Sequence, residues 1–257
     1  MSNNKKLTTP ILDVRKVSKD FTLSSKTIPI LKDVSFSIHE YEFISIVGPT
    51  GCGKSTLLRI IMGLIPPTKG EVIYKGEIVR GVNPSMSMVF QSFALFPWLT
   101  VLENVELGLE AQGMPKEQRS KRALNIIEEV GLQDFEDAYP RELSRGMKQR
   151  VGFARALVID PEILLMDEPF SALDTLTAEG LREEIMRLWS DKFTSPEIVI
   201  MVTHNVEEAI YLSDRVIVLS QRPSTVILEF DVDIPRPRDR RSQIIYKLID
   251  KITTLIA

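Results

Sequence analysis

A glycine-rich loop between an apolar run and a helical pattern constrains the fold of this chain most. The run Phe43–Val47 is continuously apolar apart from one serine, as strands buried in a parallel sheet are. The residues after the loop, 55–64, have helical spacing that ends before Pro66-Pro67. The loop fits G-x-x-x-x-G-K-[ST], and with the next threonine it consists of Gly48, Pro49, Thr50, Gly51, Cys52, Gly53, Lys54, Ser55 and Thr56. This order predicts an α/β protein that binds a nucleotide triphosphate, with Lys54 on the β- and γ-phosphates and Ser55 on Mg²⁺.

Two carboxylates follow a second apolar run, residues 163–166. They are Asp167 and Glu168, and Pro169 comes next. The carboxyl end of a strand in an open α/β sheet faces the ligand. We therefore interpret Asp167 as a Mg²⁺ ligand and Glu168 as the general base for an attacking water. A solvated Asp-Glu-Pro turn is the alternative.

The other patterns predict how the chain is organised. Alternation at 12–21 and 34–38 predicts half-buried strands, residues 71–79 a hairpin turning at Lys75-Gly76, and 86–90 and 198–203 further strands. A helical block from 101 to 131, with Pro115 as a helix start, interrupts the βα pattern. We expect a disordered tail at 1–10, one nucleotide-binding domain at 11–240 with a helical subdomain inserted at about 92–160, and a C-terminal helix at 241–257.

Charge and cysteine content exclude some classes of protein. The formal net charge of −3 does not suggest a protein that coats nucleic acid. The single cysteine, Cys52, permits no internal disulfide and fits a reducing, cytoplasmic setting. Because Cys52 lies near Lys54 and a helix start, which favour the thiolate, we predict that alkylation blocks the activity and that bound nucleotide protects.

Residues 143–150, Leu-Ser-Arg-Gly-Met-Lys-Gln-Arg, lie shortly before the second apolar run. Ser144 stands where a helix N-cap would, and a helix N-terminus with a hydroxyl favours an anion. The order of the phosphate loop, Gln91, the helical block, this segment, Asp167-Glu168, residues 171–174 and His204 resembles the ATP-binding subunits of ABC transporters over residues 12–240. The resemblance implies a P-loop NTPase (RecA-like) core with an N-terminal antiparallel β subdomain and an inserted α-helical subdomain.

The resemblance also implies roles for further residues. Gln91 would bind Mg²⁺ and sense the γ-phosphate, and His204 would promote hydrolysis, although a lone histidine at a strand end is more often structural. Ser144 and Gly146 would bind the γ-phosphate of ATP held by a second copy, and Asp174 would lie in the segment that crosses to that copy. Phe21 lies where the family has an aromatic residue that stacks on adenine; a core phenylalanine is the alternative.

Residues 144–147 correspond to the family's signature segment. They depart from the common form, L-S-G-G-Q with its leading leucine. Arg145 replaces the first glycine, and Met147 replaces the glutamine. If position 145 needs a positive φ, arginine is strained there. If it does not, the charge of Arg145 strengthens phosphate binding.

An aromatic segment, residues 92–100, follows Gln91. It is either a core cluster or a groove that receives a short helix from a membrane partner.

Three short segments resemble the ATPase subunits of nitrate, sulfonate and taurine importers: residues 96–101, 146–150 and 234–240. This implies ATP hydrolysis coupled to solute import on the cytoplasmic face of the membrane, as a peripheral subunit. The implied partners are a second copy of the chain, permease subunits and a separate solute-binding protein, with no nucleic acid. The alternatives are an exporter subunit, a soluble ABC ATPase that acts on ribosomes or DNA, and a small-molecule P-loop kinase. A small-molecule kinase would not explain residues 143–150 or 171–174, because neither segment has a role in that class of protein.

Overall fold

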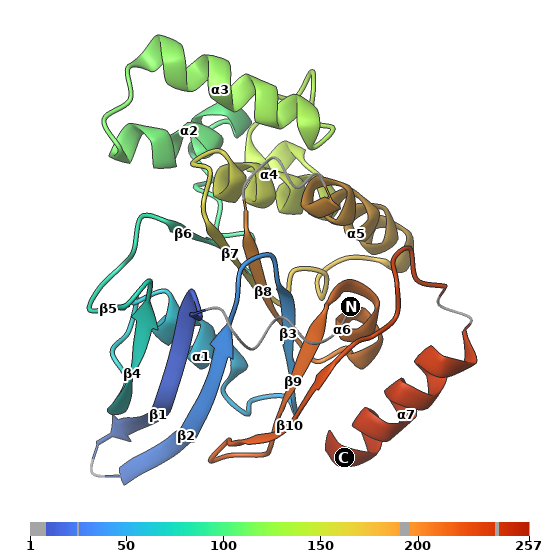
Figure 1. The fold of residues 1–257 in the computed structure, drawn as a ribbon. Coiled ribbons are helices and arrows are strands. Elements are labelled where there is room, and N and C mark those ends of the chain that lie inside the picture. Colours follow the sequence, from blue (N-terminus) through green and yellow to red (C-terminus); the bar gives the residue numbers. More distant parts are fainter. Residues whose placement is uncertain (1–8, 25, 191–195, 240–241, 257) are drawn as a thin grey trace. The chain divides into compact units, whose positions relative to one another are not determined.

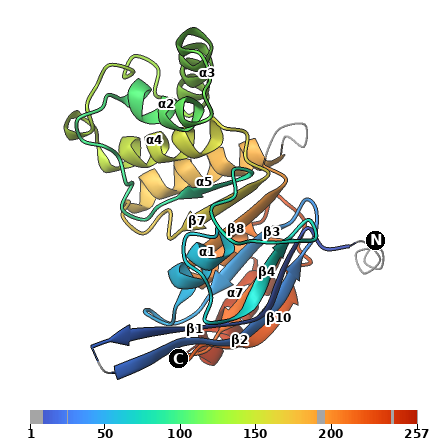
Figure 2. The same cartoon turned by 90° about the vertical axis from the view of Figure 1, so that its left-hand side faces the viewer.

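The computed structural model describes residues 9–24, 26–190, 196–239 and 242–256. The chain divides into two compact units, residues 1–83 with 198–257 and residues 84–197 (Figures 1 and 2). Most of the expected disordered tail, residues 1–8, lies outside the described residues. Within the described ranges, no helix combines the length and apolar character needed to cross a bilayer.

The first unit contains an antiparallel sheet in the order β2-β1-β4-β5. Its strands are β1 (Leu12–Leu23), β2 (Lys26–Ile38), β4 (Lys69–Tyr74) and β5 (Glu77–Ile78). Leu12 is paired with Ile38 on one side and Tyr74 on the other. The predicted hairpin is confirmed, because Tyr74 pairs with Glu77 across the Lys75-Gly76 turn.

The same unit contains the strand that leads into the phosphate loop. Strand β3 (Phe43–Val47) runs parallel to β8 (Ile198–Thr203) on one side and β9 (Arg215–Leu219) on the other, and β10 (Val226–Asp231) pairs antiparallel with β9. All five residues of β3 are buried, as its apolar run predicts. Helix α1 (Lys54–Ile61) follows the loop, α6 (Val206–Leu212) follows β8, and α7 (Gln243–Ile256) ends the chain. Residues of β3, β9, α6 and α7 share one apolar core, which includes Val47, Ile210, Val218, Ile245 and Ile252.

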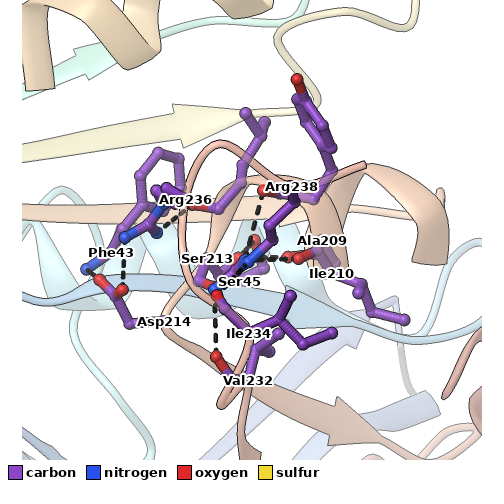
Figure 3. Close-up of polar contacts among 12 residues, drawn as sticks. Phe43, Ser45, Ala209, Ile210, Ser213, Asp214, Val232, Ile234, Arg236 and Arg238 are labelled. Atoms are coloured by element: carbon purple, nitrogen blue, oxygen red, sulfur yellow. Dashed lines mark hydrogen bonds and ion pairs between the residues drawn. The ribbon is translucent and has the colours of Figure 1, made fainter. Parts of the chain in front are cut away.

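The Pro/Arg segment before α7 is fastened to the end of α6 by two arginines (Figure 3). Arg236 donates to the carboxylate of Asp214 at 2.5 Å, and the other oxygen of Asp214 accepts from the backbone N–H of Phe43 at 3.0 Å. Arg238 is only 6% exposed, and burial lowers its pKa to about 10. Its guanidinium donates to the backbone carbonyls of Ile210, Tyr211, Ser213, Val232 and Ile234. Arginine fits this place because its five donors can satisfy carbonyls that a helix end leaves without partners.

The second unit combines two parallel strands with helices. Strand β6 (Met86–Val89) pairs with β7 (Ile163–Asp167). The helices are α2 (Val101–Ala111), α3 (Lys116–Glu129), α4 (Arg145–Leu157) and α5 (Thr175–Ser190), with a 3₁₀ turn at Pro140–Glu142. The predicted helical block is two helices, since α3 begins directly after Pro115. Apolar residues of α2, α3 and α4 form one core, which includes Val105, Leu109, Ile127, Val151 and Ala154.

Candidate functional site

Two positions of the phosphate loop have a backbone conformation that favours glycine. Gly51 and Gly53 have φ values of +77° and +117°. A Cβ added to Gly53 would lie 2.6 Å from Ile30 Cγ2, so both backbone and space exclude a side chain there. Lys54 is 4% exposed, and its Nζ donates to the carbonyls of Gly48 at 2.9 Å and Pro49 at 3.1 Å. The loop therefore encloses its lysine and presents backbone N–H groups ahead of α1, an arrangement that suits phosphate oxygens.

His204 lies at the same edge of the sheet as this loop. Val47 and Thr203 are register partners at the ends of β3 and β8, and each is followed directly by Gly48 or His204. The Thr203 hydroxyl donates to the carboxylate of Glu208 at 3.0 Å and accepts from the backbone N–H of Asn205 at 3.0 Å. Asn205 in turn caps α6. The side chain of His204 is exposed, and the hydrogen bonds of the neighbouring residues Thr203 and Asn205 fix the turn on which it lies.

In the second unit, β6 and β7 bring Gln91 and Glu168 together. Val89 and Met166 are register partners, so Gln91 and the pair Asp167-Glu168 lie at the ends of neighbouring strands. The Gln91 amide donates to Glu168 Oε2 at 3.3 Å and to the Ser171 hydroxyl at 3.3 Å. Asp167 is 4% exposed and Glu168 is half-buried with a φ of +46°. The fully solvated turn considered above is therefore wrong for Asp167.

The signature segment forms the predicted capped helix start. Ser144 is the N-cap of α4, and its hydroxyl accepts from the backbone N–H of Met147 at 3.2 Å. Arg145 is the first residue of α4 and is exposed, so its backbone is helical and the strained alternative is wrong. The first turn contains no acidic residue. Arg145 and Lys148 instead add positive charge to the positive end of the helix, which favours an anion in front of it.

Close packing against α5 requires glycine at position 146, and the sequence did not predict this contact. A Cβ at this position would lie 2.4 Å from the methyl carbon of Thr177 in α5. The hydroxyl and backbone N–H of Thr177 donate to the two carboxylate oxygens of Asp174, at 2.6 and 3.1 Å. These hydrogen bonds hold the pKa of Asp174 below its ordinary value. The signature segment and the Asp174 turn are therefore packed directly against each other.

Four further residues that the sequence singles out are placed as follows. Phe21 is 42% exposed, with Lys19 Nζ 5.2 Å from its ring centroid, so the core alternative is wrong. Cys52 is 2% exposed, and this burial limits the access of a reagent to its thiol, which opposes the reactivity expected from the sequence. In the aromatic segment, Phe96 and Trp98 are 42% and 67% exposed with ring centroids 5.3 Å apart, so these two rings are not core.

The side chains suit a nucleotide with its metal. Ser55 in the first unit and Asp167 in the second each carry an oxygen donor of the kind that Mg²⁺ prefers. The positive φ values of Gly51 and Gly53 are typical of loops whose backbone N–H groups bind phosphate. A phosphate loop, a strand-end carboxylate pair and parallel strands define the class of P-loop nucleoside triphosphatases.

Comparison with known proteins identifies the family within that class. Residues 31–171 match the family model "ABC transporter". The chain belongs to this family. It is therefore an ATPase that binds ATP with Mg²⁺, and its fold is the P-loop ABC ATPase fold predicted from the sequence.

Curated relatives cover nearly the whole chain. The nitrate import ATP-binding protein of Synechocystis is 42% identical over 254 residues, 95% of this chain and 94% of its own. The bicarbonate transport ATP-binding protein of the same organism is 42% identical over 236 residues, 91% of this chain and 83% of its own. The aliphatic sulfonates import ATP-binding protein of Bacillus cereus is 38% identical over 241 residues, 94% of both chains. The expected resemblance to importer ATPases is thus confirmed.

The fold of this chain is similar to that of a solved structure. It is the dimeric structure of a post-hydrolysis state of an ATP-binding cassette bound to ADP and Pi. It is 35% identical with a TM-score of 0.76, and the match covers 87% of this chain and 100% of that one.

Sequence reasoning missed residues that hold the site's segments in place. Thr177, Asn104 and Arg155 each contact a segment that contains an expected site residue. They lie inside helical patterns, where no spacing or motif distinguishes them from other polar helix residues.

Proposed function

We propose that this chain is the ATP-hydrolysing subunit that powers an importer for a small solute such as nitrate, a sulfonate or taurine. The observation that carries the proposal is similarity, over at least nine-tenths of the chain, to three transport ATP-binding proteins, two of them named for import. Two of those relatives are equally similar, at 42% identity, and are named for nitrate and for bicarbonate. Solute choice therefore belongs to the permease and a separate solute-binding protein, which we propose as partners.

We propose the following roles in ATP binding. The loop of Gly48–Thr56 binds the phosphates, with Lys54 on the β- and γ-phosphates. Phe21, whose ring is accessible, stacks on adenine. Ser55, Gln91 and Asp167 hold Mg²⁺, which neutralises charge on the transferred phosphoryl group.

Glu168 and His204 are the proposed catalytic residues. Glu168 accepts the proton of the attacking water, and the Gln91 amide 3.3 Å away orients its carboxylate. His204 contacts the γ-phosphate side from the end of β8, on the turn that Thr203 and Glu208 support.

We propose that Ser144, Gly146 and Asp174 complete the ATP site of a second copy. The support is the capped helix start with Arg145 and Lys148 but no acid in its first turn, which suits a γ-phosphate. An ATP-bound dimer follows, because neither copy's site is complete without the other's signature segment.

Size-exclusion chromatography of Glu168→Gln with Mg-ATP tests the dimer. We expect a shift from monomer to dimer mass, no shift for Glu168→Gln/Lys54→Ala, and none for Glu168→Gln/Ser144→Arg, which blocks the helix start. A dimer that survives Ser144→Arg would contradict the assignment of the signature segment.

Uptake measurements test the importer. A strain in which Glu168→Gln replaces the wild-type chain is compared with one carrying Leu124→Gln, a change at an exposed apolar residue of α3. We expect uptake of one labelled solute among nitrate, bicarbonate, taurine and other sulfonates to be lost only with Glu168→Gln. Unchanged uptake with increased solute retention would identify an exporter, and unchanged transport with a translation or DNA-repair defect would identify a soluble ABC ATPase.

The exposed pair Phe96 and Trp98 is the proposed contact with the permease. Their rings form an apolar surface in the segment directly after Gln91, which suits a short helix in a groove. The chain would then be a peripheral subunit on the cytoplasmic face of the membrane.

A further inference from the structure

The segment from Gln91 to Thr100 is tied to its own unit at three places. The Gln91 amide contacts Glu168 and Ser171, both at 3.3 Å. Arg155 of α4 donates to the backbone carbonyls of Ala94 at 2.6 Å and Phe93 at 2.9 Å. The third tie is a buried asparagine in α2.

The tie by Arg155 holds an unfavourable backbone. Phe93 and Ala94 have φ values of +62° and +48°, a region that residues with a Cβ avoid. Both carbonyls are taken by one guanidinium fork, a geometry that lysine cannot reproduce. Burial lowers the pKa of Arg155, because the guanidinium contacts these carbonyls in place of water. Gly152 lies one turn earlier in α4. A Cβ added to Gly152 would lie 3.8 Å from the carbonyl oxygen of Phe93, so α4 runs close to this backbone.

The asparagine fixes the far end of the segment. Asn104 is fully buried, and its amide nitrogen donates to the carbonyls of Phe96, Leu99 and Thr100 at 3.2, 3.0 and 2.8 Å. Its oxygen accepts from the backbone N–H of Phe96 at 2.9 Å. The exposed rings of Phe96 and Trp98 are therefore mounted on a backbone fixed to α2.

Arg155 and the signature residue Ser144 belong to one rigid helix. Ser144 caps the start of α4, and Arg155 lies eleven residues further along, a distance of about 16.5 Å at about 1.5 Å per residue. A displacement of the Gln91 segment is therefore passed through the guanidinium to the helix that begins with the signature.

We propose that Arg155 is a positioning residue that fastens the Gln91 segment to the signature helix, so that Gln91, the Phe96–Trp98 pair and Ser144 move together when ATP binds. This inference rests on the proposed function, because the movement matters only if Phe96 and Trp98 contact a permease. It assigns to one side chain the coupling between that contact and the proposed second half of the ATP site.

A neighbouring arginine on the same helix is a matched control. Arg150 of α4 donates to the carbonyl of Val130 at 2.6 Å and pairs with Glu184 at 2.6 Å. These contacts join α4 to Val130 and Glu184, and not to the Gln91 segment. Arg150→Met and Arg155→Met therefore both remove a guanidinium bound to backbone, and only the second releases Phe93 and Ala94.

The first readout uses the full chain alone. In Arg155→Met, amide hydrogen exchange at residues 92–100 is expected to accelerate by at least about tenfold, because the loss of one hydrogen bond to a charged group has about this effect. Residues 151–157 should stay protected. Arg155→Lys should give an intermediate acceleration, and Arg150→Met should leave residues 92–100 unchanged. Unchanged exchange at residues 92–100 in Arg155→Met overturns the proposal, and this result does not depend on whether the chain binds a permease.

The second readout uses the chain in complex with the membrane partner with which it co-purifies. With Arg155→Met, the KM for ATP is expected to stay within about twofold while the partner-stimulated kcat falls at least about tenfold. Arg150→Met should retain stimulation, and Arg155→Lys should restore part of it. Equal losses in both methionine variants would show a purely structural role and overturn the proposal. A wild-type chain with no membrane partner would contradict the proposed function instead, and the exchange measurement still decides the tie.

Discussion

Replacing Gly146 with alanine tests the packing between the signature segment and the Asp174 turn. The new Cβ would lie 2.4 Å from Thr177 Cγ2, whereas carbon atoms in contact are about 3.5–4.0 Å apart. One of the two segments must therefore move by about 1 Å. Overpacking of this kind costs about 1–3 kcal/mol, and alanine returns about 0.5–1 kcal/mol in a helix. We expect Gly146→Ala to lower the free energy of unfolding by up to about 2.5 kcal/mol.

The partner change Thr177→Ser isolates the cause. Serine removes the methyl group but keeps the hydroxyl that donates to Asp174 at 2.6 Å. The double variant should therefore recover at least about 1 kcal/mol relative to the sum of the single changes. Gly180→Ala in α5 is the control, because nothing lies within 4 Å of the added Cβ, and it should stabilise the chain.

Urea unfolding followed by circular dichroism measures these differences, and ATPase activity is measured in parallel. Activity should fall in Gly146→Ala and return with Thr177→Ser, since the Asp174 turn regains its position. If the two substitutions are additive within about 0.3–0.5 kcal/mol, the contact between Gly146 and Thr177 has no energetic role and the reasoning is wrong.

Four further predictions follow from single sites. Gly53→Ala should weaken ATP binding at least about tenfold by calorimetry, because it adds a clash 2.6 Å from Ile30 to the strain of its φ; Gly76→Ala, also at positive φ but without a clash, should leave binding intact. Arg238→Met should cost about 3 kcal/mol in urea unfolding, since several buried carbonyls lose their donor, while the exposed Arg222→Met should change it by less than about 0.5 kcal/mol. N-ethylmaleimide should label Cys52 slowly in the native chain and more slowly with ATP, and inactivate it; full activity after complete labelling would refute the placement of Cys52 in the loop. Glu168→Gln should lower kcat for ATP by about 10²–10⁴ with binding retained, and a loss below tenfold would exclude Glu168 as the base.

Features set by short-range chemistry were predictable from the sequence. The apolar run Phe43–Val47, the glycines after it and the Ser144 cap are each determined within a few residues, and the structure has all three where expected. The start of α3 directly after Pro115 was also expected, because proline has no N–H to leave unpaired there and its φ is fixed near the helical value.

Features set by contacts between distant segments were not predictable. Gly146 is needed because of Thr177, and the Gln91 segment is held by Arg155, some sixty residues away. Neither pair leaves a local pattern. The exposure of Phe21, Phe96 and Trp98 was likewise undecided, because aromatic residues in short segments have no spacing that separates a core position from a binding surface.

Affinity purification of the tagged chain from gently solubilised native membranes tests the central claim most directly. The chain should co-purify with a multi-span permease in near one-to-one ratio, and Trp98→Glu should reduce that recovery while Leu124→Glu, at an exposed apolar residue of α3, should not. Recovery of the wild-type chain only from the soluble fraction, with ribosomes, DNA or no partner, would contradict the importer account.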